Sequence, residues 1–298
     1  MDMIEPLPPW GIFAPEDLVG PALTSYHACV MAKRLALLLC VLFVGTAAVR
    51  AQQPKTVFLE QLTWIEVRDL IRSGTTTIIV PIGGTEQNGP YMVLGKHNVR
   101  VQMLSEKIAV KLGNALVAPV LAYVPEGRLS PPTAHMRFPG TITIPDETFE
   151  KVLESAARSF KLHGFRDVVF LGDHGGYKKG VAAVADRLNR EWAKTPVRVH
   201  ALAEYYHASE IDYVQMLRHR GFRDEEIGTH AGLSDTSVML ALDPRLVRMD
   251  QLRSATRIER ADGTYGDPRQ ASAELGQLGV DAIVSRTVSA IRQAVVHR

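Results

Sequence analysis

Short β-branched runs alternate with longer amphipathic stretches along most of this chain, and this alternation limits its fold more than any other feature. Strands are expected at 75–80, 115–120, 167–171 and 197–202, and helices at 62–73, 99–112, 148–163, 180–194, 235–242 and 272–296. The runs at 75–80 and 167–171 lack polar alternation, which is typical of strands covered on both faces. The pattern predicts an α/β fold, a three-layer α/β/α sandwich with a mostly parallel central sheet.

Composition supports one folded domain and excludes several classes of protein. Hydrophobic residues make up 46% of the 298 residues and charged residues 22%, a globular balance that excludes disordered and collagen-like chains. A net charge of +2, without a basic run interleaved with aromatic residues, argues against a nucleic-acid partner. Because no repeat or low-complexity linker interrupts it, residues 52–298 are expected to form a single domain.

The N-terminal region carries the three parts of a secretory signal. Lys33 and Arg34 precede an almost wholly apolar stretch at 35–49, and Val49 and Ala51 fit a small-residue cleavage site. Residues 31–51 are therefore predicted to be a signal peptide of an exported protein, periplasmic or secreted, with no membrane association after cleavage; a buried core helix or a membrane anchor is the alternative. Residues 1–30 are expected to be a spurious or disordered extension before Met31.

Cysteine usage removes further kinds of chemistry. Cys29 and Cys40 are the only two cysteines, and both precede the expected cleavage point. The mature chain would therefore have no thiol nucleophile, Cys-ligated zinc or disulfide framework.

Three polar, glycine-containing segments carry histidines or carboxylates, at 83–98, 172–177 and 229–237. The first two directly follow predicted strands, where α/β folds collect their active sites. Glycine-flanked Glu and His at strand ends are typical of a metal site in an α/β enzyme. Each segment alone has a plainer interpretation: a solvated loop, a helix cap at 235–237, or a phosphate cradle at 172–180 that fits no glycine-rich motif.

Four motifs in order resemble the creatininase (creatinine amidohydrolase) family. The run TTTIIVPIGGTEQNGPYMVLGKHN resembles its strand followed by P-x-G-x-x-E-x-H-G-x-H and an Asp. His135–Thr141 resembles H-x-x-F-P-G-T, Gly172–Tyr177 the turn N-G-H-G-G-N, and His230–Ser237 the segment H-A-G-E-x-E-T-S. Over Phe58–Val296 the chain is identified as a divergent, secreted member. The resemblance implies a homo-oligomer that hydrolyses an amide C–N bond of a small, often cyclic molecule with metal-activated water.

Carried over by position, the resemblance implies an altered metal site. Glu86 matches a metal-ligand Glu with a catalytic role, and His174 matches a ligand His. His97 stands where the family has the Asp that bridges two metals, and a neutral imidazole nitrogen cannot bridge two cations. The resemblance therefore implies one divalent ion, zinc or alternatively manganese, held by Glu86, His97 and His174. Asp173 would be a fourth ligand or would orient an imidazole.

The resemblance also implies the remaining site residues. His230 matches the His that shuttles a proton to the leaving nitrogen. Four further residues are expected to bind substrate, with a surface-loop position as the alternative for His135: Asn88, His135, Tyr177 and Asp235.

The expected function is that of an exported, metal-dependent hydrolase acting on a small amide. One alternative is a non-catalytic protein that binds a small ligand on the same scaffold, favoured by Asn88, Leu233 and the altered turn at Asp173. The other is hydrolysis of an ester, lactone or sugar-ring substrate, because metal-bound hydroxide attacks such carbonyls equally well.

Overall fold

The computed structural model describes residues 56–296, which form one compact unit. The expected extension at 1–30 and the expected signal peptide at 31–51 lie outside these residues. Among the described helices, none combines the length and the apolar character needed to cross a bilayer.

Four parallel strands form the central sheet in the order β2-β1-β3-β4. Their bounds are β1 Thr77–Ile82, β2 Ala115–Val117, β3 Asp167–Gly172 and β4 Arg198–Ala201. In register, Thr77 pairs with both Ala115 and Asp167, and Asp167 pairs with Arg198. Every residue of β1 is buried, as its unbroken apolar run predicts.

The helices expected from the sequence are all present, with ends that shift by a few residues. The described helices are α2 Trp64–Arg72, α3 Lys96–Leu112, α4 Asp146–His163, α5 Lys178–Glu191, α6 Ala203–His207, α7 Tyr213–His219, α8 Asp224–Ile227, α9 Leu233–Leu242, α10 Met249–Ser254 and α11 Ala273–Val296, with a π-helical turn at Ala208–Asp212. A capping box between Thr63 and Glu66 begins α2, and left-handed Gly113 and Gly164 end α3 and α4. The sequence analysis missed α6, α7, α8 and α10, which are too short to show an apolar period.

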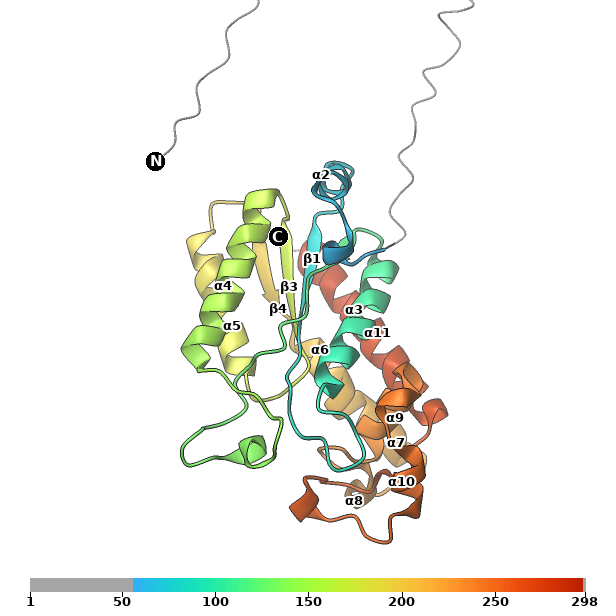
Figure 1. Cartoon of the computed structure of the whole chain (residues 1–298). Coiled ribbons are helices and arrows are strands. Elements are labelled where there is room, and N and C mark those ends of the chain that lie inside the picture. The colour runs from blue at the N-terminus through green and yellow to red at the C-terminus, as the bar shows by residue number, and fades with distance from the viewer. Residues whose placement is uncertain (1–55, 297–298) are drawn as a thin grey trace, which may run out of the picture. The chain divides into compact units, whose positions relative to one another are not determined.

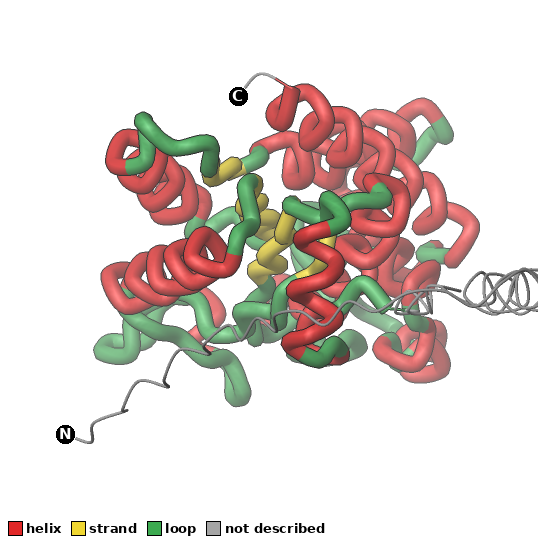
Figure 2. The backbone as a smooth tube through the Cα atoms, turned by 90° about the horizontal axis from the view of Figure 1, so that it is seen from above, coloured by secondary structure: helices red, strands yellow, loops and turns green. Residues whose placement is uncertain are grey.

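Helices cover both faces of the sheet, which confirms the three-layer α/β/α sandwich. Ile79 and Val169 point into a core shared with α3, α9 and α11. Ile78 and Val168 point the other way, into a core shared with α4 and α5. Figure 1 shows these two groups on opposite sides of the strands, and Figure 2 shows the strands between them from above.

The loops that follow β1, β2 and β3 all leave the sheet at its carboxyl edge, where they gather in Figure 1. Because these three strands are neighbours in the sheet, residues distant in sequence meet there.

Candidate metal centre

The loop after β1 places Glu86 at the carboxyl edge of the sheet, where its side chain is fully buried. The first turn of α3 fixes the course of this loop, because Asn98 Oδ1 accepts a bond from Gly84 N–H at 2.9 Å. Gly84 has a φ of 153°, and a Cβ there would lie 2.5 Å from Oε1 of Glu126. Glycine at 84 therefore lets the Glu126 carboxylate approach the Glu86 loop closely.

His97, in the first turn of α3, connects two buried carboxylates. Its Nε2 lies 2.8 Å from Glu86 Oε1, and its Nδ1 lies 2.7 Å from Asp173 Oδ2. Both nitrogens can donate at once only when the ring is doubly protonated. In this position His97 orients Glu86 and has no nitrogen directed at another ligand.

Asp173, at the end of β3, is surrounded by donors. Besides His97, Arg100 Nε donates to it at 2.8 Å and the Tyr205 hydroxyl at 2.6 Å. Burial acts to raise the pKa of Asp173, but the Arg100 charge and these hydrogen bonds lower it overall. This carboxylate is held as an anion whose oxygens are already occupied.

Two buried cations, Lys96 and Arg100, lie beside this network and share one carboxylate, Asp235. Lys96 is 1% exposed, and its Nζ donates to Asp235 Oδ2 at 3.0 Å. Arg100 Nη1 donates to the other oxygen of Asp235 at 2.6 Å. Asp235, in the first turn of α9, thus ties α9 to α3, and the charges of the two cations hold its pKa well below the usual value although burial opposes this.

On one side of Glu86 lie Glu126, from the segment after β2, and His174, directly after Asp173. His174 Nε2 is 3.6 Å from Glu86 Oε2, and His174 Nδ1 is 3.7 Å from Glu126 Oε2. The side-chain atoms of Glu86 and Glu126 are fully buried, and the small exposed part of Glu126 belongs to its backbone. Burial and the Glu86 charge raise the pKa of Glu126 to about 9.

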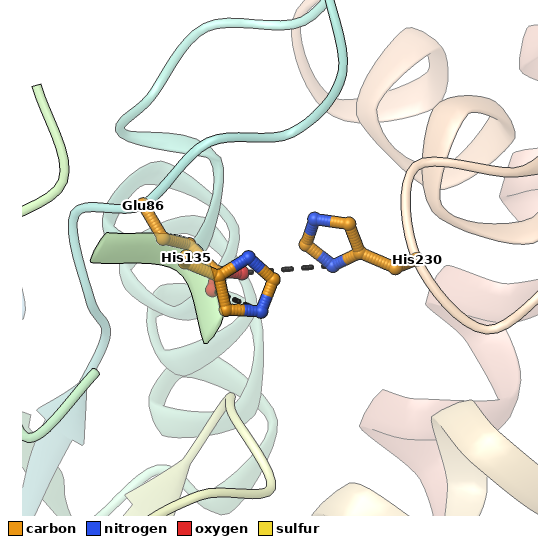
Figure 3. A group of neighbouring side chains, drawn as sticks. All are labelled: Glu86, His135 and His230. Carbon is orange, nitrogen blue, oxygen red and sulfur yellow. Dashed lines mark ion pairs between the residues drawn. The ribbon is translucent and has the colours of Figure 1, made fainter. Parts of the chain in front are cut away.

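On the other side lie His135 and His230, whose rings face Glu86 in Figure 3. His135 Nε2 is 3.2 Å from Glu86 Oε2, and His230 Nδ1 is 3.7 Å from Glu86 Oε1. The Gln87 side-chain amide joins the two rings, 2.9 Å from His135 Nδ1 and 3.1 Å from His230 Nε2. The backbone carbonyl of Gln87 lies 2.9 Å from the same nitrogen of His230.

The imidazoles on both sides are neutral at neutral pH. Burial lowers the pKa of His174 to about 3, aided by the charge of His97, and burial with the charge of Lys96 lowers the pKa of His230 to about 4. Burial also lowers the pKa of His135. Neutral rings are the form that binds a metal or accepts a proton.

The residues fit a divalent cation in two ways. One group is Glu86, Glu126 and His174, and the other is Glu86, His135 and His230; in each, one oxygen or nitrogen per residue lies within 4.8 Å of the others. Three oxygens of the Glu86–Glu126 pair make no well-aligned hydrogen bond with the described residues. Carboxylates and imidazoles are suitable donors for zinc or manganese.

The structure brings most of the sequence-predicted residues together but changes their arrangement. Glu86 and His174 share a possible metal group, while His97 and Asp173 instead form the hydrogen-bonded network behind Glu86. His135 lies within the site, with its Nε2 3.2 Å from Glu86 Oε2.

Two of the other expected substrate-binding residues, Asn88 and Tyr177, bind backbone groups behind the site. Asn88 Nδ2 donates to the carbonyls of Glu86 and Val93, at 2.9 and 3.1 Å. The Tyr177 hydroxyl lies between backbone groups of Ile82 and Asp173. Asn88 and Tyr177 therefore brace the loops, and Asp235 orients Lys96 while also lining the cavity described next.

A cavity of about 250 Å³ opens beside the cluster. Lys96, His174 and His230 line it together with Tyr206, Glu210 and Tyr265. A second hollow reaches the cluster from the side of Glu126, and His135 and His174 line both. A molecule of a few heavy atoms would fit beside Glu86 with these rings around it.

The sequence analysis missed Glu126, Gln87, Lys96 and Arg100. Glu126 follows the expected strand at 115–120, so its place after the neighbouring strand was the available signal. The signal for the other three residues was their closeness in sequence to predicted site residues. Gln87 directly follows Glu86, Lys96 directly precedes His97, and Arg100 lies three residues after His97.

Comparisons with known proteins agree with the fold. A profile of the creatininase family, described as creatinine amidohydrolase, matches residues 60–291. Creatinine amidohydrolase of Pseudomonas putida is 26% identical over 256 residues, covering 80% of this chain and 97% of that protein. The 3-dehydro-scyllo-inosose hydrolase of Thermotoga maritima is 27% identical over 200 residues, covering 67% of this chain and 60% of that protein.

Solved structures of creatininase also match the fold of this chain. A mutant creatininase of Zn–Zn type superposes with a TM-score of 0.66 at 27% identity, covering 81% of this chain and 99% of that chain. A manganese form of creatininase matches with the same TM-score and identity, covering 80% of this chain and 99% of that chain.

Proposed function

Because the chain belongs to the creatininase family, whose characterised relatives are hydrolases, we propose that it is a metal-dependent hydrolase of a small amide C–N bond. The observation that carries this proposal is the Glu86 cluster: a buried carboxylate with neutral imidazoles on both sides, beside a cavity of small-molecule size.

The metal would be held at Glu86 by one of the two three-residue groups. When bound there, a divalent ion, zinc or manganese, would polarise a carbonyl and lower the pKa of a water toward neutrality. We expect one ion per chain, because His97 occupies Glu86 Oε1, which leaves Oε2 of this carboxylate to bind a cation.

His230 is suited to move a proton between water and the leaving nitrogen. Its Nε2 can donate to the Gln87 carbonyl or accept from the Gln87 side-chain amide, so either ring nitrogen can carry the proton without losing a partner. Its lowered pKa keeps it able to accept a proton at neutral pH.

The surrounding charges have a positioning role. His97 holds Glu86 in one orientation, and Asp173 and Asp235 hold His97 and Lys96 in turn. Groups fixed in this way need no reorganisation when charge develops on a substrate, which favours the transition state.

The size of the cavity and two of the relatives support a small substrate. A cavity of about 250 Å³ suits a small, possibly cyclic amide rather than a long peptide. A second candidate is a ring substrate without an amide bond, such as a lactone or cyclic ketone, because one relative is an inosose hydrolase.

The test compares wild type with His230→Asn after metal removal and reloading with zinc or manganese. The loaded wild type should hydrolyse a member of a panel of small cyclic amides and lactones, and the variant should lose roughly 100- to 10,000-fold in kcat. His207→Asn, an exposed histidine outside the cluster, is the matched control and should retain the rate. Equal rates with and without metal, or ligand binding without turnover, would contradict the proposal and favour a binding protein.

We also propose export to the periplasm or medium, because residues 31–51 have the three-part signal pattern. N-terminal sequencing of the mature protein should begin at Gln52; retention of residues 31–51 would contradict export. By family resemblance we propose a homo-oligomer, which light scattering on the purified protein would test.

A further inference from the structure

The carboxylates of Glu86 and Glu126 lie together in the protein interior without enough donors. Glu126 is 4% exposed and Glu86 is fully buried. Both oxygens of Glu126 have no hydrogen-bond partner among the described residues, and Glu86 Oε2 makes no well-aligned hydrogen bond there, although His135 Nε2 lies 3.2 Å from it. Buried polar atoms are normally satisfied, and carboxylate oxygens without a donor are costly unless a cation or a proton compensates them.

His174 completes a cation site between these carboxylates. Its Nδ1 faces Glu126 Oε2 at 3.7 Å, and its Nε2 faces Glu86 Oε2 at 3.6 Å. Gly176 N–H donates to His174 Nδ1 at 3.3 Å, so Nδ1 carries the lone pair and faces Glu126, while the proton on Nε2 faces the Glu86 carboxylate. This pairing of an imidazole with a carboxylate is usual for histidine ligands.

The alternative group contains a histidine in the wrong tautomer. Gln87 Oε1 accepts from Gly89 N–H at 2.8 Å, which fixes the direction of the amide. Gln87 Nε2 therefore donates to His135 Nδ1 at 2.9 Å, and the single proton of the neutral His135 ring must lie on Nε2. That nitrogen is the one that faces Glu86, so it has no lone pair for a cation.

We infer that the cation binds between Glu86, Glu126 and His174, with Glu126 as a ligand, and that His135 is a hydrogen-bond donor facing the site. This inference rests on the proposed metal dependence and specifies which residues carry it. The absence of a side chain at Gly84 leaves space for the Glu126 carboxylate beside Glu86. The cation would therefore lie on the side of Glu86 that faces Glu126.

The test measures Zn²⁺ affinity of the metal-stripped full-length protein by competition with a chromogenic chelator. Glu126→Gln should weaken Zn²⁺ binding by more than the roughly 10- to 100-fold that changes outside the ligand set cost. Glu126→Asp keeps the charge on a shorter side chain and should give an intermediate loss. His135→Gln should weaken the affinity by no more than this roughly 10- to 100-fold.

Glu210→Gln is the matched control, because Glu210 lines the neighbouring cavity but belongs to neither metal group. It should leave Zn²⁺ affinity unchanged, and circular dichroism should show that all four variants are folded.

The outcomes separate this inference from the proposed function. Strong loss in His135→Gln with little loss in Glu126→Gln would overturn the inference and leave a metal-dependent hydrolase. Strong loss in both would also overturn it, because the cation would then contact both sides of Glu86. Failure of the wild type to bind Zn²⁺ or Mn²⁺ would overturn the proposed metal dependence and, with it, this inference.

Discussion

Replacing Glu126 with Gln should change how the stability of the metal-free protein depends on pH. In the folded protein, burial and the Glu86 charge raise the pKa of Glu126 to about 9, from an ordinary value of 4.5. Between these two values the folded state holds one proton more than the unfolded state. The free energy of unfolding therefore falls as pH rises through this window. Glu126→Gln removes this dependence because its carboxamide does not titrate.

The expected magnitude follows from the proton count. One proton corresponds to about 1.4 kcal/mol per pH unit, so wild type should lose about 2 kcal/mol relative to Glu126→Gln between pH 7 and pH 8.5. Above pH 7 the histidines of the site do not contribute to this slope. The pKa values of His174 and His230 are lowered in the folded protein, so these residues change the stability only below about pH 6.5, where an unfolded histidine becomes protonated.

The assay is urea unfolding in the presence of a chelator at several pH values between 7 and 8.5. Glu191→Gln is the control, since the pKa of the exposed Glu191 is lowered to about 2, far below the window, and its curve should run parallel to that of the wild type. If wild type and Glu126→Gln also ran parallel, Glu126 would be ionised throughout, and our account of its environment would be refuted.

Two further changes test the framework around the site. Lys96→Met should cost roughly 3–5 kcal/mol in thermal or urea unfolding, because it leaves Asp235 without one of its buried partners; a loss below about 1 kcal/mol would contradict this. Gly228→Ala should destabilise more than Gly221→Ala in urea unfolding. Both glycines have positive φ, which costs about 1–2 kcal/mol, but only Gly228 is packed against Tyr265. Equal losses would show that the contact does not matter.

The strands and the longer helices could be predicted because each carries its own periodic signal. The run at 75–80 and the run at 167–171 are buried on both faces, and both became neighbouring strands of the sheet. The short helices α6 and α7 follow β4 without two full turns of apolar spacing, so only tertiary packing defines them.

The candidate site was predictable in its location and only partly in its connections. Glu86 and His174 were found because each follows a strand in a glycine-containing segment. The environment of His97 was not predictable, since it depends on Asp173, 76 residues away, meeting it at 2.7 Å. Glu126 was missed for the same reason: a single glutamate in a loop shows its burial only once the fold places it against Gly84.

The most direct test of the whole account is the position of the cation. Crystals of the protein grown with zinc should give, at the zinc absorption edge, one anomalous peak per chain between Glu86, Glu126 and His174. Its distances to their oxygen and nitrogen atoms should be about 2.0–2.2 Å. A peak between His135 and His230 would contradict the ligand assignment, and the absence of any peak at Glu86 would contradict the proposal that this protein is a metal-dependent hydrolase.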